Sequence, residues 1–276
     1  MEKLSSSFRT AFVTGASAGL GRAFAEMLLE EGVRVWGTAR DLNRLEPLRP
    51  REGFTGVVLD LENSERASLA FQEAAEAAGG FDLLVNNAGY GVFGSFAAVD
   101  FDVWQKQFDA MIGTAARLSH VALRQMLAAR RGCIVNVASL AAEFPLPFMS
   151  GYNVAKAGLS ALSESLMLET RGTGVVVIDF RPGDYRTGFN RSMQRVPASG
   201  SPDARQTRAW AALEVNLNQA QPAERAADVL RCALRRRKSG TVRSGSFLQA
   251  GLAPFFMRFV PLSWRRWVVA RYYGIS

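Results

Sequence analysis

The stretch that decides the fold is residues 13–23, VTGASAGLGRA, which joins a short apolar run to a helical pattern. Gly15, Gly19 and Gly21 permit a tight turn and let the backbone approach a phosphate, which the free N–H groups of a helix start can bind. Glycine clusters also serve turns alone, and no Gly-Lys-Ser/Thr follows to make a nucleoside-triphosphate loop. The order strand, glycine turn, helix predicts a phosphate-binding turn of a dinucleotide site.

Outward from this turn, continuously apolar runs alternate with helical patterns. Each apolar run is short enough for a buried strand and each is followed by a helix, which is typical of a parallel sheet covered on both faces. We therefore expect an α/β fold in one domain, a doubly wound parallel sheet of about seven strands, with ligands at the carboxyl ends of the strands. The expected strands are 9–15, 33–39, 54–61 (ending at Asp60), 82–89, 132–139 and 174–183, and the expected helices are 20–32, 64–79, 101–130 and 151–171.

The end of the second strand refines the ligand. A site for NAD commonly places an acid here to bind the ribose, but this chain has Ala39 followed by Arg40. An arginine suits a 2′-phosphate through charge-assisted hydrogen bonds, and Ser17 in the glycine turn could add a hydroxyl. Arg40 thus indicates NADP(H), although a solvated arginine at a strand end is the alternative and Asp41 lies next to it.

A second group of residues offers acid–base chemistry. Tyr152 and Lys156 are four residues apart, so they share a face of the expected helix, and Ser139 ends the fifth strand. We expect Lys156 to lower the pKa of Tyr152 by its positive charge. Tyr152 would then exchange a proton with a carbonyl or alcohol oxygen that Ser139 also holds, while a nicotinamide carries the hydride. A tyrosine–lysine pair at this spacing is common and carries little weight alone.

Four motifs in order, TGASAGLG, NNAG, YNVAK with an upstream serine, and RPGDYRT, resemble the short-chain dehydrogenase/reductase (SDR) family over residues 8–190. The resemblance implies a Rossmann-type fold and an NADP-dependent oxidoreductase acting on a carbonyl/alcohol pair, with reduction as the favoured direction. It assigns catalysis to Ser139, Tyr152 and Lys156. Of these three residues, Tyr152 and Lys156 would also contact the cofactor. It assigns the cofactor's phosphates to Gly15, Ser17, Gly19, Leu20 and Gly21, its 2′-phosphate to Arg40, its adenosine to Asp60, Leu61, Asn87, Ala88 and Gly89, and its nicotinamide end to Pro182, Gly183, Tyr185 and Thr187.

The chain departs from the family pattern on the helix after the fourth strand. Many members have an asparagine there that anchors a water linked to the lysine, whereas this chain has Met111, with Ala110 as the other possible alignment. Neither side chain can form that hydrogen bond, so the proton relay would be rerouted or turnover slowed. His120, further along the helix, is expected to be a packing or surface residue.

Composition and charge limit the partners. The two cysteines suit a reducing, cytoplasmic setting with inert thiols, and no Cys/His spacing suggests a metal. The N-terminus shows no secretion signal, and no apolar run reaches the ~18 residues of a spanning helix. The residues after Asp228 include ten Lys and Arg and no Asp or Glu. The net charge of +8 therefore belongs to the C-terminal part of the chain.

Two segments lie outside the motifs. The polar region of about residues 188–222 is expected to be a lid over the site or a mobile surface loop. The basic aromatic segment 250–276 could close an apolar pocket, pack on another subunit or lie on an anionic membrane; no nucleic-acid platform is expected. Pocket closure would favour a bulky apolar ketone or aldehyde. A homodimer or homotetramer through the two long helices is expected, and a non-catalytic cofactor-binding regulator and a membrane-surface scaffold remain alternative functions.

Overall fold

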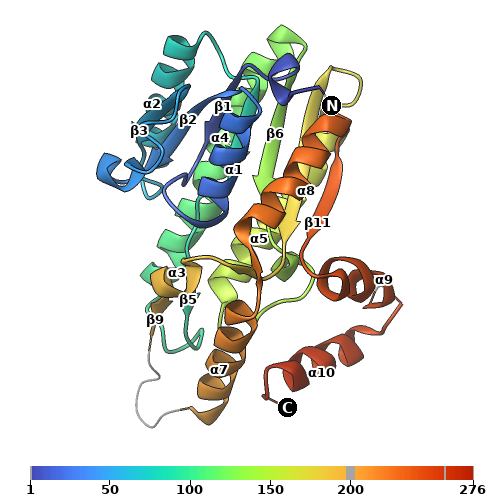
Figure 1. The fold of residues 1–276 in the computed structure, drawn as a ribbon. Helices are drawn as coiled ribbons and strands as arrows, with labels where there is room; N and C mark the ends of the chain where they lie inside the picture. The colour runs from blue at the N-terminus through green and yellow to red at the C-terminus, as the bar shows by residue number, and fades with distance from the viewer. Residues whose placement is uncertain (1, 197–202, 258, 276) are drawn as a thin grey trace.

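The computed structural model of the 276-residue chain describes residues 2–196, 203–257 and 259–275. Figure 1 shows a single layer of strands with helices on either side. The central sheet has seven parallel strands in the order β11-β7-β6-β4-β1-β2-β3, which confirms the doubly wound fold. Its strands are β1 (Thr10–Val13), β2 (Arg34–Ala39), β3 (Phe54–Val58), β4 (Leu83–Asn86), β6 (Gly132–Val137), β7 (Val175–Pro182) and β11 (Gly240–Ser244).

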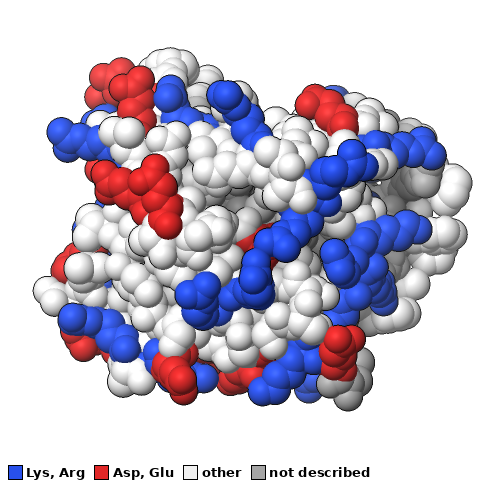
Figure 2. Space-filling model, turned by 90° about the horizontal axis from the view of Figure 1, so that it is seen from above, with Lys and Arg blue, Asp and Glu red and all other residues white. Residues whose placement is uncertain are grey.

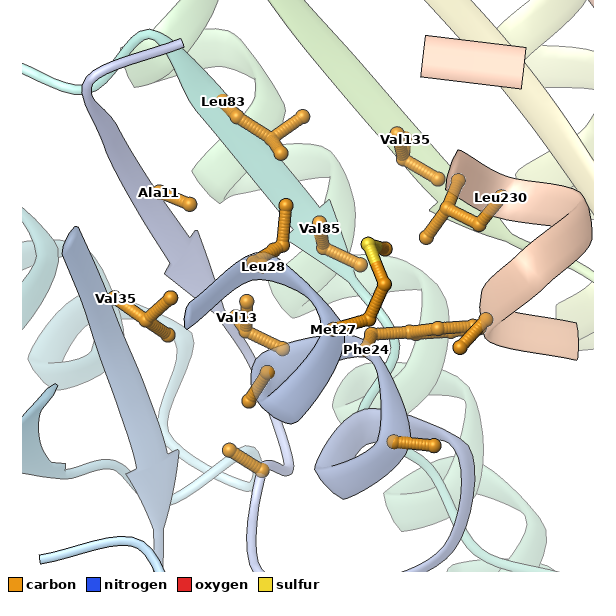
Figure 3. Packing of buried hydrophobic residues seen from close by; sticks show 14 of the residues in the cluster. Ala11, Val13, Phe24, Met27, Leu28, Val35, Leu83, Val85, Val135 and Leu230 are labelled. Atoms are coloured by element: carbon orange, nitrogen blue, oxygen red, sulfur yellow. The ribbon is translucent and has the colours of Figure 1, made fainter. Parts of the chain in front are cut away.

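The two faces of the sheet pack against different helices because strand side chains alternate in direction. Ala11 and Val13 face one side, where α1 (Gly19–Glu30) and α8 (Ala223–Arg236) contribute most of the helical contacts, and Phe12 faces the other. In Figure 3, Phe24, Met27 and Leu28 of α1 lie against the strands on the first side. The second side is covered by α2 (Ser64–Ala78), α4 (Thr114–Ala129) and α5 (Ser150–Glu169).

The expected helix 101–130 is interrupted. It comprises α3 (Phe101–Phe108), a π-helical turn at Asp109–Gly113 and α4. A π-turn inserts an extra residue into the helix and often marks a functional site. Here it carries Ala110 and Met111, both of which are buried. The prediction of one regular helix is therefore corrected at the position where the chain departs from the family pattern.

The region 188–222 contains helices and short strands rather than a loop alone. It contains α6 (Phe189–Ser192), β9 (Gln194–Arg195), which pairs with β5 (Val92–Phe93), the helix α7 (Ala204–Asn218), and β10 (Gln221–Pro222), which pairs with β8 (Tyr185–Arg186). Residues 197–202 lie outside the described residues. Leu213 of α7 is buried in a small core with Phe93 and Met149, so α7 packs as a structural helix rather than a solvated loop.

The C-terminal segment forms a π-helical turn at Phe247–Leu252 and two short helices, α9 (Ala253–Met257) and α10 (Leu262–Tyr272). Pro261 is the N-cap of α10, so this helix begins directly after a proline. In Figure 1 these helices lie beside the end of the molecule toward which the strand arrows point. Within the described residues, no helix is long and apolar enough to cross a membrane.

The late positive charges occupy two places rather than one tail. Arg235 and Arg236 lie in the last turn of α8, where a helix dipole favours cations, and Arg237 is its C-cap. Seen from above Figure 1, Lys and Arg gather over the side of the molecule on which α8 lies (Figure 2). Arg265 and Arg266 belong to α10 instead. These late positive charges are therefore divided between α8 and α10, which lie at different ends of the molecule.

Candidate active site

A cavity of about 1490 Å³ opens where the sheet strands end. It spans the glycine turn after β1, the ends of β2, β4, β6 and β7, and the N-terminal part of α5. Every predicted site residue except Gly21 lines it: Gly15, Ser17, Gly19, Leu20, Arg40, Asp60, Leu61, Asn87, Ala88, Gly89, Ser139, Tyr152, Lys156, Pro182, Gly183, Tyr185 and Thr187.

The glycines allow the turn after β1 to lie close against the start of α1. Gly15 and Gly19 have φ of 70° and 55°, a region that favours glycine. Gly21 lies beneath the turn, because a Cβ there would be 2.2 Å from the oxygen of Gly15 and 2.4 Å from Nδ2 of Asn87. The N-cap, Ala18, has no side chain that can accept from the first N–H groups of α1. Ala18, Gly19 and Leu20 line the cavity, so the helix start can offer these donors to the phosphates of a dinucleotide.

Asn87 and Ala88 are fixed by Thr14 at the end of β1. Oγ1 of Thr14 accepts hydrogen bonds from the backbone N–H groups of both residues at 2.9 Å. Nδ2 of Asn87 donates to the backbone oxygen of Thr14 at 3.0 Å. The Asn87 side chain thus joins β1 to the segment after β4. Thr14 was not among the predicted residues, and its position one before the glycine turn was the only signal for it.

Two arginines line the adenosine end of the cavity. Arg40 follows β2 and is exposed, and Arg44 lies four residues further along the chain. Neither guanidinium forms an ion pair with a carboxylate in the described part of the chain. The side chain of Asp41 caps the short helix after β2, since its Oδ1 accepts a hydrogen bond from the backbone N–H of Asn43 at 2.9 Å. Two cations are therefore available here, and Arg44 was missed because a single arginine in a loop carries no pattern.

Ser139, Tyr152 and Lys156 meet at the other end of the cavity. Ser139 directly follows β6, and α5 presents Tyr152 and Lys156 on one face. Nζ of Lys156 donates to the backbone oxygen of Val137 at 2.6 Å and lies 5.8 Å from the centre of the Tyr152 ring. Oγ of Ser139 accepts from the backbone N–H of Ala141 at 3.0 Å. The predicted constellation is therefore assembled in space by a strand end and one helix.

The pKa of Lys156 is lowered to about 8 by burial, against which the charge of Asp179 raises it. Burial raises the pKa of Tyr152, a hydrogen bond with Ser139 lowers it, and the charge of Asp184 raises it. The expectation that Lys156 lowers the tyrosine pKa is not met. Burial is the largest influence on the tyrosine pKa, and the Lys156 ammonium donates to a backbone carbonyl of β6.

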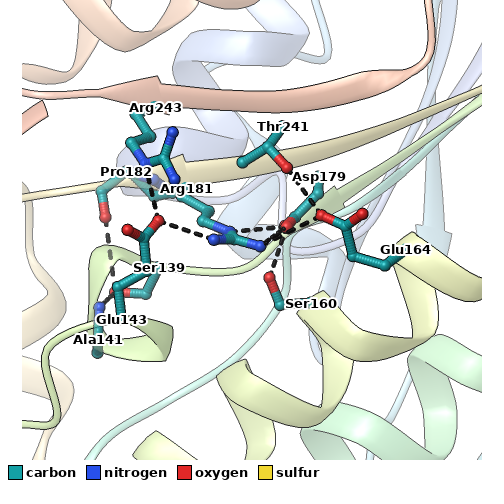
Figure 4. A network of polar contacts seen from close by, with 10 residues as sticks. All are labelled: Ser139, Ala141, Glu143, Ser160, Glu164, Asp179, Arg181, Pro182, Thr241 and Arg243. Carbon is teal, nitrogen blue, oxygen red and sulfur yellow. Dashed lines mark hydrogen bonds and ion pairs between the residues drawn. The ribbon is translucent and has the colours of Figure 1, made fainter. Parts of the chain in front are cut away.

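Asp179, which supports Lys156 electrostatically, belongs to a polar network on the outer strands (Figure 4). Nε of Arg181 and Oγ of Ser160 donate to Oδ2 of Asp179 at 2.7 Å and 2.5 Å. Arg181 also donates to Glu143 at 2.7 Å, and Arg243 donates to the same carboxylate at 2.8 Å. Asp179 is fully buried, and burial raises its pKa, which the bonds from Ser160 and Arg181 partly offset.

Met111 projects into the cavity next to Gly89, where a Cβ would be 3.0 Å from its methyl group. The side chain at this position cannot hold a water by a strong hydrogen bond, as the sequence predicts. Four residues earlier, Gln107 is buried and donates from Nε2 to the backbone oxygen of Tyr90 at 2.9 Å. Its Oε1 has no hydrogen-bond partner among the described residues.

The wall facing Tyr152 is largely apolar and comes from late segments of the chain. Leu213 and Leu217 of α7 line it, together with residues of the C-terminal helices. This places the basic aromatic segment over the cavity, which the sequence held as one of three alternatives. The C-terminal lining residues are Leu248, Gln249, Leu252, Phe256, Met257, Val268, Val269, Tyr272 and Tyr273.

The comparisons with known proteins agree with this geometry. A family model described as short chain dehydrogenase matches residues 9–197. The chain belongs to the short-chain dehydrogenase/reductase family. It is an oxidoreductase of that family, whose fold binds a nicotinamide cofactor.

Three individual proteins illustrate the range of similar members. An "Uncharacterized oxidoreductase" of Myxococcus xanthus is 39% identical over 64% of this chain and 72% of its own length. A 3-ketodihydrosphingosine reductase of Bacteroides thetaiotaomicron is 31% identical over 67% of each chain. A solved short-chain dehydrogenase/reductase of Burkholderia phymatum, in complex with NAD, is 25% identical with a TM-score of 0.80, over 91% of this chain and 92% of its own.

Proposed function

We propose that the protein is an NADP(H)-dependent SDR enzyme that reduces a bulky apolar ketone or aldehyde to the alcohol. The observation that carries this proposal is the meeting of Ser139, Tyr152 and Lys156 beside an apolar cavity wall. Polar groups able to hold and protonate an oxygen thus lie next to a surface that suits a hydrophobic substrate.

The roles follow from the positions. Tyr152 would donate the proton to the carbonyl oxygen, and Ser139 would hold the same oxygen by a hydrogen bond. Lys156, fixed by Val137, would keep a positive charge below the tyrosine ring. When bound, the nicotinamide supplies the hydride. Pro182, Gly183, Tyr185 and Thr187 would hold its ring end, and Tyr185 is itself held by Ser244, whose Oγ lies 2.5 Å from its hydroxyl.

NADP(H) is proposed over NAD(H) because Arg40 and Arg44 are free to bind a 2′-phosphate at the end of β2. A 2′-phosphate offers charge-assisted and bidentate bonds to guanidinium groups. Gly15, Ser17, Gly19, Leu20 and Gly21 would form the phosphate turn, and Asp60, Leu61, Asn87, Ala88 and Gly89 would surround the adenosine. The Burkholderia structure holds NAD, so the fold alone does not decide between NAD(H) and NADP(H).

A large ketone is favoured by the size of the cavity and by its apolar C-terminal wall. The name of the Bacteroides relative, 3-ketodihydrosphingosine reductase, also specifies a keto substrate. The region 188–222, with α7, and the segment 250–276 would act as the substrate-binding part of the single domain 1–276.

The test is NADPH consumption by the purified protein with two methyl ketones, one with a short and one with a long alkyl chain. We expect the long ketone to have at least ~10-fold higher kcat/KM, since several buried CH₂ groups each contribute about 0.8 kcal/mol. NADPH binding without turnover of any ketone or aldehyde would favour the non-catalytic regulator. Equal rates for both chain lengths would contradict the apolar pocket.

Self-association is proposed through the helices α4 and α5, which expose apolar side chains. Val154 and Leu168 of α5 are 57% and 77% exposed. Such side chains on a helix surface suit a homodimer or homotetramer interface. A cytoplasmic location is proposed because Cys133 and Cys232 are both free thiols.

Weak association with an anionic membrane is a second candidate property. Phe259, Trp264 and Trp267 are 73%, 64% and 55% exposed on the C-terminal segment. Arg265 and Arg266 lie between the two tryptophans. Aromatic and basic side chains together suit a headgroup region, and this surface adjoins the wall of the cavity.

A further inference from the structure

Asp184 is the acidic side chain at the catalytic end of the cavity. The other acids that line the cavity, Asp60 and Glu62, lie at its adenosine end, on the segment after β3. Asp184 follows Gly183 directly, so it lies between the nicotinamide-end residues and the apolar C-terminal wall. It lies inside the RPGDYRT motif, but none of the roles derived above uses its side chain.

The carboxylate is held in place by the C-terminal segment. Nε2 of Gln249 donates to Oδ2 of Asp184 at 2.7 Å. Gln249 also covers the neighbouring Gly183, where a Cβ would be 3.0 Å from its Oε1. The same segment is tied to this turn by Ser244, whose backbone oxygen accepts from the N–H of Gly183 at 2.6 Å. The acid is thus oriented by a dedicated side chain rather than left to solvent.

Among the side chains that the structure describes, no lysine or arginine forms an ion pair with Asp184. Burial raises its pKa and the bond from Gln249 lowers it. Its charge also raises the pKa of Tyr152, Tyr272 and Tyr273, which places the carboxylate within electrostatic reach of the catalytic tyrosine and of the end of α10. A partly buried carboxylate in an apolar cavity costs free energy unless a donor or cation meets it.

We propose that Asp184 is a specificity-determining residue that binds a protonated amine on the substrate, close to the ketone that Tyr152 protonates. The substrate class is then an amino ketone with an apolar chain: the ammonium lies against Asp184, the carbonyl against Ser139 and Tyr152, and the chain along the C-terminal wall. Gln249 positions the carboxylate for this contact. This inference rests on the proposed function.

The test compares decyl methyl ketone, decyl hydroxymethyl ketone and decyl aminomethyl ketone with NADPH as the reductant. The native enzyme is expected to favour the aminomethyl ketone over the methyl ketone by at least ~10-fold in kcat/KM, the scale of a charge-assisted hydrogen bond. Asp184→Asn should abolish this preference while keeping turnover of the methyl ketone. Asp184→Glu should keep part of the preference for the aminomethyl ketone, because the carboxylate remains. Gln249→Leu should weaken the preference without abolishing it, because Asp184 keeps its charge but loses the bond that orients it.

A native enzyme that reduces the methyl or hydroxymethyl ketone as well as the aminomethyl ketone would overturn the proposal, as would an Asn variant that keeps the preference. If no ketone is reduced, the proposed function fails, and binding decides the inference separately. Calorimetry with decylamine should then show binding to the native protein that weakens at least ~10-fold in Asp184→Asn. No decylamine binding, or equal binding by both proteins, would overturn the role of Asp184.

Discussion

Nζ of Lys156 donates to the carbonyl oxygen of Val137 at 2.6 Å, so the lysine of α5 is bound to the end of β6. The contact fixes the ammonium beneath Tyr152 and satisfies a charge that burial disfavours. Burial lowers the pKa of Lys156 to about 8, and Asp179 raises it. The charge state of this lysine therefore depends on Asp179, a buried residue of β7 that does not line the cavity.

The first prediction concerns pH. If turnover needs the Lys156 ammonium, activity should fall as pH rises through about 8. Asp179→Asn removes a charge that raises this pKa, so the fall should move to lower pH. Glu164→Gln is the control, because Glu164 pairs with Arg181 in the same network but is more exposed. The measurement is a pH–kcat profile, with thermal unfolding to show that both variants fold; an unmoved profile in Asp179→Asn would contradict the link.

The second prediction separates catalysis from binding. Tyr152→Phe removes the proton donor and leaves the ring in place. Turnover should fall by about 10²–10⁴, the usual contribution of a general acid, while NADPH affinity is retained. Rates come from NADPH consumption and affinity from fluorescence titration. An active Phe variant would mean that another group protonates the oxygen.

The third prediction concerns nucleotide choice. Arg40→Ala and Arg44→Ala should each weaken NADPH binding by about 10-fold and leave NADH binding unchanged, because only NADPH offers the 2′-phosphate. Arg34→Ala is matched in charge and lies at the other end of β2, over the ring of Trp36. Tighter binding of NADH than NADPH by the native protein would count against the assignment.

The fourth prediction tests the glycine turn. Gly21→Ala places a Cβ 2.2 Å from the Gly15 oxygen, so α1 must move away from the turn. The free energy of unfolding should drop by about 1–3 kcal/mol and NADPH binding should be lost. Gly158→Ala on α5 meets only ordinary contacts with Ile112 and should be neutral or slightly stabilising. Urea unfolding and NADPH titration measure both effects.

The fifth prediction tests the membrane candidate. Co-sedimentation with phosphatidylserine vesicles should decrease as salt rises and should decrease further in the double variant Trp264→Ser, Trp267→Ser. Leu168→Ser removes an even more exposed apolar side chain on α5 and should leave vesicle binding unchanged. Salt-independent or absent binding by the native protein would remove this candidate.

The sequence by itself determined the sheet and the main constellation. The short, β-branched apolar runs before the glycine turn and before Ser139 indicate buried strands, and parallel strands place the residues after them at one edge of a sheet. The helical spacing of Tyr152 and Lys156 is a local property, so the sequence could predict their shared face. Arg40 was found in the same way, from its place at a strand end.

Tertiary structure decided the features that depend on segments distant in the sequence. The π-turn at Met111, the helix α7 inside the expected loop and the two separate locations of the late arginines were not visible as local patterns. The bond from Lys156 to Val137 joins residues nineteen apart, and the bond from Gln249 to Asp184 joins residues sixty-five apart. Burial, and with it the pKa of Lys156 and the environment of Asp184, arises only when distant segments of the chain pack together, because desolvation is a property of the assembled fold.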